Sequence, residues 1–191
     1  MSSLSRNTRR ANSPLRLRAL STGLALALAS GAALADGAHR FVFTAYSDAA
    51  GGAEVVSGRY RAALEALEIH PDTMDLDPSA ANTNRCVAFS MTLQWRQARA
   101  ACDAAVHAAR AQRTRVPAWL GGIRQSQDEY LALAYANRAV MHWMSRDGGA
   151  AQDDLMKARA LAPQADFVAR NVAALEAHAT VARATVPAPK S

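Results

Sequence analysis

The sequence lacks the motifs on which most catalytic and metal sites are built. It contains no HExxH pair, no glycine-rich phosphate-binding loop and no Gly-x-Ser-x-Gly nucleophile elbow. The adjacent carboxylates Asp153 and Asp154 would point about 100 degrees apart on a helix, so they do not form an acid–base pair. No two of the five histidines have the helical spacing of a metal site: His39, His70, His107, His142 and His178. We therefore expect a protein that is not an enzyme and that carries no metal or cofactor.

A hydrophobic run long enough to cross a membrane is also missing. The apolar stretch at residues 19–29 has about 11 residues, whereas a membrane-spanning helix needs about 20. It follows five arginines without any acidic residue, and it precedes Ala33-Leu34-Ala35. This order of charged, apolar and small residues is typical of a secretory signal peptide. We therefore expect cleavage after Ala35, no membrane span after that cleavage, and a periplasmic or secreted location.

Lysine is scarce, and the excess of positive charge lies mostly in the predicted signal peptide. The chain has 22 basic and 16 acidic residues, and its only lysines are Lys157 and Lys190. Residues 1–35 hold five of the basic and none of the acidic residues, so 17 and 16 remain, a net charge of +1. Phosphate binding needs a clustered surplus of lysine and arginine on the folded part. We therefore expect no nucleic-acid partner.

Two stretches of the chain parallel each other at an offset of 53 residues: Asn84-Arg85-Cys86-Val87 corresponds to Asn137-Arg138-Ala139-Val140. Around the second stretch, residues 131–163 have the pattern of two amphipathic helices folded across Asp147-Gly148-Gly149. Counted back 32 positions from Pro163, this region resembles a tetratricopeptide repeat. Its aromatic, small and bulky places are held by Tyr135, Ala139, Ala151, Leu155 and Ala158.

The resemblance implies an all-α fold of antiparallel helix hairpins, stacked as a short right-handed solenoid with a C-terminal capping helix. The chain would then comprise a signal peptide (1–35), an N-terminal capping or irregular segment (36–53), a helical repeat domain (54–184) and a disordered tail (185–191). The helical domain would consist of a half-repeat (54–71), a repeat (79–112), an insertion (113–131), a second repeat (132–165) and the capping helix (166–184).

The segment at residues 36–53 is the least regular part of the expected mature chain. Phe41-Val42-Phe43 is apolar, yet Gly51-Gly52 interrupts the run before a helix can extend. We expect this segment to pack over the exposed end of the first half-repeat, in which a shortened first helix and a turn at Ser57-Gly58 precede a second helix that ends at Ile69. The alternative is a strand or tail that is offered to a partner.

The insertion at residues 113–131 combines proline, glycine and arginine with Trp119. We expect a loop followed by a helix from about Gln127 to Ser145, with Ser126 beginning a Ser-x-x-Glu capping box. Trp119 is expected to cover the junction between hairpins, and the alternative is that it binds a ligand.

The chain has two cysteines, Cys86 and Cys102, at places 8 and 24 of the first repeat. These places face each other across the hairpin, and two cysteines in a secreted protein favour a disulfide. Closing a loop of about 17 residues would contribute roughly 3 kcal/mol. The alternative is that both are small core side chains at ordinary repeat positions.

The resemblance also implies where a partner would bind. In such repeats the first helix of each hairpin lines the inner face, which is the usual surface for peptides. In repeat proteins that clamp a peptide's terminal carboxylate, an asparagine before an arginine contacts the ligand, although the lysines of those clamps are missing here. The expected partner-binding residues are Asn84 and Val87 in one repeat and Leu133, Asn137, Val140 and Trp143 in the other. The alternative is that the two asparagines hold neighbouring helices together.

These observations predict a non-catalytic protein–protein interaction module of the bacterial cell envelope, whose partner is another envelope protein or a peptide segment. The alternative is a structural or assembly subunit with no peptide groove in use. Such a protein could be a homo-oligomer, in which an apolar patch at Phe41, Phe43 or Trp119 pairs two chains.

Overall fold

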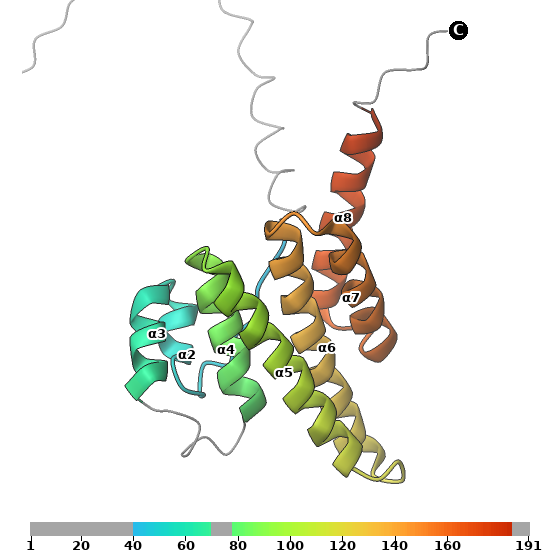
Figure 1. The fold of residues 1–191 in the computed structure, drawn as a ribbon. Coiled ribbons are helices and arrows are strands. Elements are labelled where there is room, and N and C mark those ends of the chain that lie inside the picture. Colours follow the sequence, from blue (N-terminus) through green and yellow to red (C-terminus); the bar gives the residue numbers. More distant parts are fainter. Residues whose placement is uncertain (1–39, 70–77, 185–191) are drawn as a thin grey trace, which may run out of the picture.

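Helices account for all regular structure in the part of the chain that the computed structural model describes, residues 40–69 and 78–184. This part contains seven α-helices and no strand, so the predicted all-α class is confirmed (Figure 1). The expected signal peptide and C-terminal tail lie outside the described residues. The helices are α2 (Gly52–Val56), α3 (Tyr60–Ile69), α4 (Pro78–Met91), α5 (Trp95–Arg115), α6 (Gly121–Met144), α7 (Gly148–Leu161) and α8 (Asp166–Ala184).

Two helix hairpins, α4 with α5 and α6 with α7, close with the same turn. Leu93 in the first turn has a φ of 60° and Arg146 in the second a φ of 67°, both in the left-handed region. In each turn the next residue donates its backbone N–H to the carbonyl five positions earlier, at 2.9 and 2.8 Å. A left-handed residue with such a bond is a common way for a helix to end. The offset of 53 residues in the sequence thus relates two turns of the same backbone structure.

The insertion lengthens two helices instead of forming a long loop. α5 continues to Arg115 and α6 begins at Gly121, which leaves residues 116–120 outside the helices. The predicted helix start near Gln127 with Ser126 as its cap is therefore wrong, because Ser126 lies inside α6 and its hydroxyl donates to the carbonyl one turn earlier, at 3.3 Å.

The first half-repeat consists of a short first helix, a turn at Ser57-Gly58 and a second helix, as the sequence indicates. α2 ends at Val56 and α3 begins at Tyr60. Gly58 in the turn between them has a φ of 75°, a conformation that glycine adopts without the steric cost that other residues incur.

Alanine builds much of the core between the helices. In the largest buried cluster, α5, α6 and α7 meet through Ala105, Ala139 and Ala158, each at most 1% exposed. Leu155 and Val168 fill the remaining space. Small side chains allow neighbouring helices to approach closely. The inner faces of α4, α6 and α8 can therefore contact one common segment, residues 41–46.

Candidate functional site

Three buried asparagines lie one on each of three helices. Asn84 on α4, Asn137 on α6 and Asn171 on α8 are each at most 1% exposed. An amide side chain carries two donors and an acceptor, and burying it without partners costs free energy. Each of these asparagines must therefore find hydrogen-bond partners inside the fold.

Those partners are backbone groups of the chain's own N-terminal segment, residues 41–46. Asn171 accepts from the N–H of Val42 at 2.7 Å and donates to its carbonyl at 3.0 Å. Asn137 makes the same pair of bonds with Thr44, at 2.9 and 2.6 Å. Asn84 repeats them with Tyr46, at 3.0 and 2.9 Å, and also donates to the carbonyl of Ala50 at 3.1 Å. We call these three side chains the asparagine ladder.

The ladder requires that the segment be extended. In an extended chain the N–H and C=O of one residue point to the same side, and those of the next residue point to the other side. Residues 42, 44 and 46 are the ones bound, so every second residue faces the asparagines. The segment crosses α8, then α6, then α4 before it enters α2, and Figure 1 shows it in blue passing behind the helices.

This course differs from the position expected from the sequence. The segment was expected to cover the end of the first half-repeat, and the bond between Val42 and Asn171 joins residues 129 positions apart, at the other end of the helix array. The expectation is therefore wrong for residues 42–44. On the inner face, the backbone groups of the segment find hydrogen-bond partners and its phenylalanines find apolar neighbours. The inner face is therefore a better environment for this segment than the end of the array.

The side chains of Phe41 and Phe43, which alternate with the bound residues, pack against the surrounding helices. The ring centroid of Phe41 is 5.0 Å from that of Trp143 on α6 and 5.8 Å from that of His178 on α8. Phe43 packs against two buried clusters, one around Met141 and one around Val87. Apolar burial of these two rings adds to the seven hydrogen bonds of the ladder.

An open groove of about 540 Å³ remains beside the segment. It is mainly apolar and is lined by Arg40, Phe41, Phe43, Met91, Val140, Met144, Ala177, His178 and Val181. The segment itself therefore forms part of the wall of this groove.

Five of the six residues predicted to bind a partner lie at or near this segment. Asn84 and Asn137 bind its backbone, Trp143 packs against Phe41, and Val140 lines the neighbouring groove. Val87 is in the cluster on which Phe43 packs, and Leu133 is 9% exposed on α6. Neither asparagine serves only to join helices, since both bind the N-terminal segment.

Asn171 is a residue that the sequence analysis missed. It lies 34 positions after Asn137, the length of one tetratricopeptide repeat. The resemblance places residues 166–184 in a capping helix that shields the last repeat, so it does not indicate Asn171 as a residue of the inner face. The repeat length counted forward from Asn137 was the signal that could have identified it.

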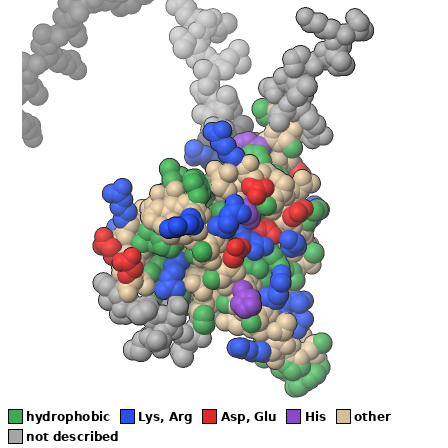
Figure 2. Space-filling view, in the orientation of Figure 1, with side chains coloured by type: hydrophobic (Ala, Val, Ile, Leu, Met, Phe, Trp, Pro, Cys, Tyr) green, Lys and Arg blue, Asp and Glu red, His purple; other side chains and the backbone are tan. Residues whose placement is uncertain are grey.

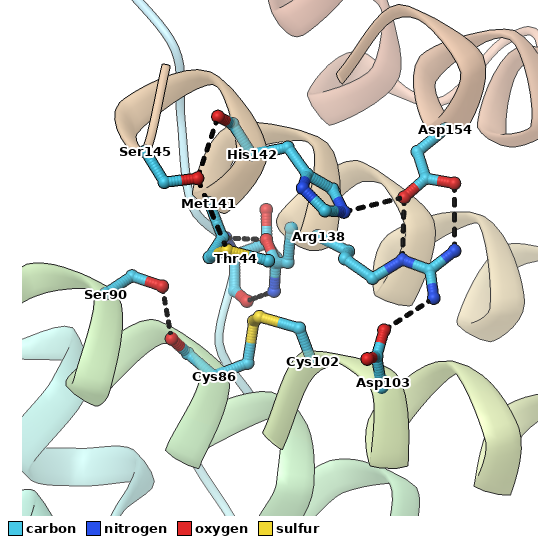
Figure 3. The surroundings of a disulfide bond; sticks show 11 residues. Thr44, Cys86, Ser90, Cys102, Asp103, Arg138, Met141, His142, Ser145 and Asp154 are labelled. Atoms are coloured by element: carbon cyan, nitrogen blue, oxygen red, sulfur yellow. Dashed lines mark hydrogen bonds and ion pairs between the residues drawn. A yellow bond between two sulfur atoms is a disulfide. The ribbon is translucent and has the colours of Figure 1, made fainter. Parts of the chain in front are cut away.

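Arg138, which stands where the repeat pattern usually has leucine, links three helices. Its guanidinium donates to both carboxylate oxygens of Asp154 on α7, at 2.7 and 2.9 Å, and to Asp103 on α5 at 2.8 Å. Figure 3 shows Arg138 lying between the two carboxylates. Asp154 is 2% exposed, and these hydrogen bonds raise the pKa of Arg138 above its usual range. The network compensates the charge of a buried carboxylate, and its position away from the segment gives it a role in packing.

His142 lies beside the same network. Burial lowers the pKa of His142 below its usual value, and Arg99 and Arg138 act in the same direction. The carboxylates of Asp154 and Asp147 oppose this shift without overcoming it. His142 is therefore favoured in its neutral form inside the fold.

Cys86 on α4 and Cys102 on α5 are joined by a disulfide with a Cα–Cα distance of 4.7 Å. Figure 3 shows the bond bridging the two helices, and the Ser90 hydroxyl donates to the carbonyl of Cys86 at 2.6 Å. The disulfide therefore cross-links the two helices of the hairpin that carries Asn84.

The described residues contain no group of three or more histidine, cysteine, aspartate or glutamate side chains that could hold a metal ion. Within residues 40–69 and 78–184, no helix is both long and apolar enough to cross a membrane. What the site offers chemically is a row of amides that pairs with an extended backbone. Comparisons with protein-family models, with curated proteins and with solved structures find no match for this chain.

Proposed function

We propose that the protein is a non-catalytic protein–protein interaction module of the bacterial cell envelope, in which tetratricopeptide-like repeats form a short right-handed solenoid. Two features support the repeat arrangement: the matching turns of the two hairpins and the spacing of the ladder, whose last two asparagines are 34 residues apart. In this proposal α8 is the first helix of a further repeat as well as the cap of the array. The expected partner is an envelope protein or peptide, with no nucleic acid and no cofactor.

The observation that carries the proposal is the pairing of the ladder with backbone atoms alone. Six of its bonds go to the N–H and C=O groups of residues 42, 44 and 46, which are present in almost any peptide. A site of this kind holds extended chains of different sequence, while its apolar walls select the side chains between them. The site therefore has the chemistry of a peptide groove.

The asparagine ladder is occupied by a segment of the same chain. Because residues 41–46 are joined to α2 by the short turn at residues 47–51, they have an effective concentration on the order of millimolar or higher at the ladder. A partner peptide must therefore displace a tethered competitor. We propose that the N-terminal segment acts as the resident ligand, which a partner replaces.

Weakening the resident ligand should open the groove. Thr44→Pro removes the N–H that donates to Asn137, whereas Thr44→Val retains it and serves as the matched control. A fluorescent peptide with the sequence of residues 40–47 should bind the proline variant about tenfold more tightly than the valine variant, as expected for the loss of about one hydrogen bond from the competitor. Fluorescence anisotropy measures both affinities.

Adding Asn137→Ala to the Thr44→Pro chain should abolish peptide binding if the ladder is the site. Equal binding with and without Asn137 would show that the peptide binds elsewhere. Absence of binding by every variant, with circular dichroism showing folded helices, would contradict the proposal.

The second candidate is a structural or assembly subunit in which no partner ever replaces the N-terminal segment on the asparagine ladder. The observation that favours it is the burial of all three asparagines beneath the resident segment. In that case Thr44→Pro lowers stability without creating a peptide site. Light scattering of the unmodified protein would then show a homo-oligomer, since assembly and not peptide capture would be its role.

A further inference from the structure

The hairpin formed by α5 and α6 extends beyond the core of the molecule. The last buried residue on α5 is Ala109 and the first on α6 is Leu131, and none of residues 110–130 is buried. At 1.5 Å per residue, about six residues of α5 and ten of α6 carry the hairpin roughly 10–15 Å past the core. Figure 1 shows its tip, in yellow, projecting below the other helices.

Arginines hold this projection in shape without a hydrophobic core. The guanidinium of Arg113 pairs with Asp128 across the hairpin. Arg124 on α6 donates to the carbonyls of Arg113 and Val116, both at 2.9 Å, and thereby ties the end of α5 to α6. The tip is therefore a fixed structure.

The apex of this fixed structure is apolar. Trp119 is 80% exposed and Ile123 is 54% exposed, with Pro117 and Ala118 also exposed beside them. Figure 2 shows hydrophobic side chains covering the end of the projection. The prediction that Trp119 covers a junction between hairpins is wrong. Trp119 lies in the turn between α5 and α6, and its side chain is exposed to solvent. We call residues 116–123 the apolar apex.

The charged residues next to the apolar apex in the sequence are all positive. No acidic residue occurs between Asp103 and Asp128, whereas Arg110, Arg113, Arg115 and Arg124 all lie in this interval. Arg115 is exposed and has no ion-pair partner among the described residues. Because the chain without residues 1–35 has a net charge of only +1, these arginines are a local feature.

We propose that the apolar apex inserts into the surface of a bilayer that contains anionic lipids. Tryptophan is enriched at membrane–water interfaces, and arginines just behind an apolar tip can pair with lipid headgroups while their stems remain among apolar groups. A stable protein–protein contact needs about 800 Å² per partner, which a convex tip of eight residues does not easily provide. A few apolar side chains suffice for reversible attachment to a bilayer. This inference is independent of the peptide groove.

Binding to vesicles tests the proposal. The chain starting at Asp36 contains every described residue and lacks the apolar run at residues 19–29, which would itself bind lipid. It should bind vesicles of phosphatidylcholine with phosphatidylglycerol more tightly than vesicles of phosphatidylcholine alone. The double variant Trp119→Ser, Ile123→Ser should lose binding by about tenfold or more, because two apolar side chains are removed from the lipid. Co-sedimentation measures both affinities.

Two further variants make the result specific. Val181→Ser removes another exposed apolar side chain, 63% exposed on α8, and should leave vesicle binding unchanged. Arg115→Gln should weaken binding to the anionic vesicles by about fivefold and leave the weaker binding to neutral vesicles unchanged. Equal binding by the double variant and by Val181→Ser would overturn the proposal. Absence of vesicle binding by the unmodified chain would do the same, even if the apex bound a protein.

Discussion

At the scale of single residues, the asparagine ladder makes one side chain responsible for two backbone groups. Asn137→Ala would leave the N–H and the C=O of Thr44 without their partner in a partly buried position. We expect the free energy of unfolding to fall by about 2–3 kcal/mol, because unsatisfied polar groups retain their desolvation cost. Urea unfolding measures this change.

Asn82→Ala on α4 is the control for this prediction. Its amide oxygen accepts from Arg85 at 3.2 Å, near the surface. It should change stability by less than about 0.5 kcal/mol. Equal effects of the two substitutions would contradict a special role for the ladder.

A second residue-scale prediction concerns pH. The pKa of His142 is lowered by burial, so the unfolded chain binds a proton at this residue before the folded chain does. As pH falls below the unfolded value of about 6.5, the folded state therefore loses stability until pH reaches the folded pKa of His142. His142→Gln should have a shallower loss of melting temperature between about pH 7 and pH 5 than the unmodified chain.

The same measurement on His107→Gln controls for the removal of a histidine, since His107 is exposed on α5. This control should follow the unmodified chain. If His142→Gln has the same pH dependence as the control, burial of His142 does not govern acid stability.

At the scale of elements, the disulfide holds α4 and α5 together. Cys86 and Cys102 are 16 positions apart, and the double variant Cys86→Ala, Cys102→Ala should lose about 3 kcal/mol of stability through the greater entropy of the unfolded chain. Thermal unfolding of the double variant should match that of the unmodified chain under reducing conditions. A much lower stability of the variant would indicate a packing defect in place of the lost cross-link.

The contact between α2 and the extended segment depends on a glycine. A Cβ on Gly52 would lie 1.9 Å from the carbonyl oxygen of Tyr46, a distance that backbone atoms cannot accommodate without moving. Gly52→Ala should therefore destabilise the fold by more than about 2 kcal/mol, or displace α2 from the segment.

Gly149→Ala is the matched control, because a Cβ at Gly149 would meet no atom within 4 Å. It lies in α7, where alanine has the higher helix propensity, so a gain of up to about 1 kcal/mol is expected. Circular dichroism at increasing urea concentration compares the two. Similar behaviour of both variants would show that α2 does not press on Tyr46.

At the scale of the whole molecule, the segment ties α8, α6 and α4 into one unit. Hydrogen exchange of the amides of Val42, Thr44 and Tyr46 then requires release of the segment or global unfolding. We expect slow exchange at these three residues and faster exchange at Phe43 and Ala45, which face the other side of the extended chain. Amide exchange followed by NMR would show this alternation, and uniform exchange along the segment would contradict it.

The sequence predicted the parts of this arrangement that depend on short-range periodicity. Small residues at repeat spacing predicted the helices, and the parallel between Asn84 and Asn137 predicted two members of the ladder. The occupant of the groove could not be predicted in the same way. An extended segment has no helical period, and its bonds join residues 38 to 129 positions apart. The sequence named Trp119 as a possible apolar patch but did not predict the helical projection that carries it, because proline and paired glycines indicate a long loop, while only five residues lie outside the helices there.

The bond between Val42 and Asn171 also sets an order of events in folding. At 5–20 residues per second, on the order of ten seconds separates the synthesis of these two residues. During that interval the first part of the segment has no partner on α8, and Phe41 lacks its ring contact with His178. Helices α4 to α7 can form hairpins in the meantime, because their contacts are local. The N-terminal segment, although made before every helix described here, is therefore among the last parts of the molecule to take its final place.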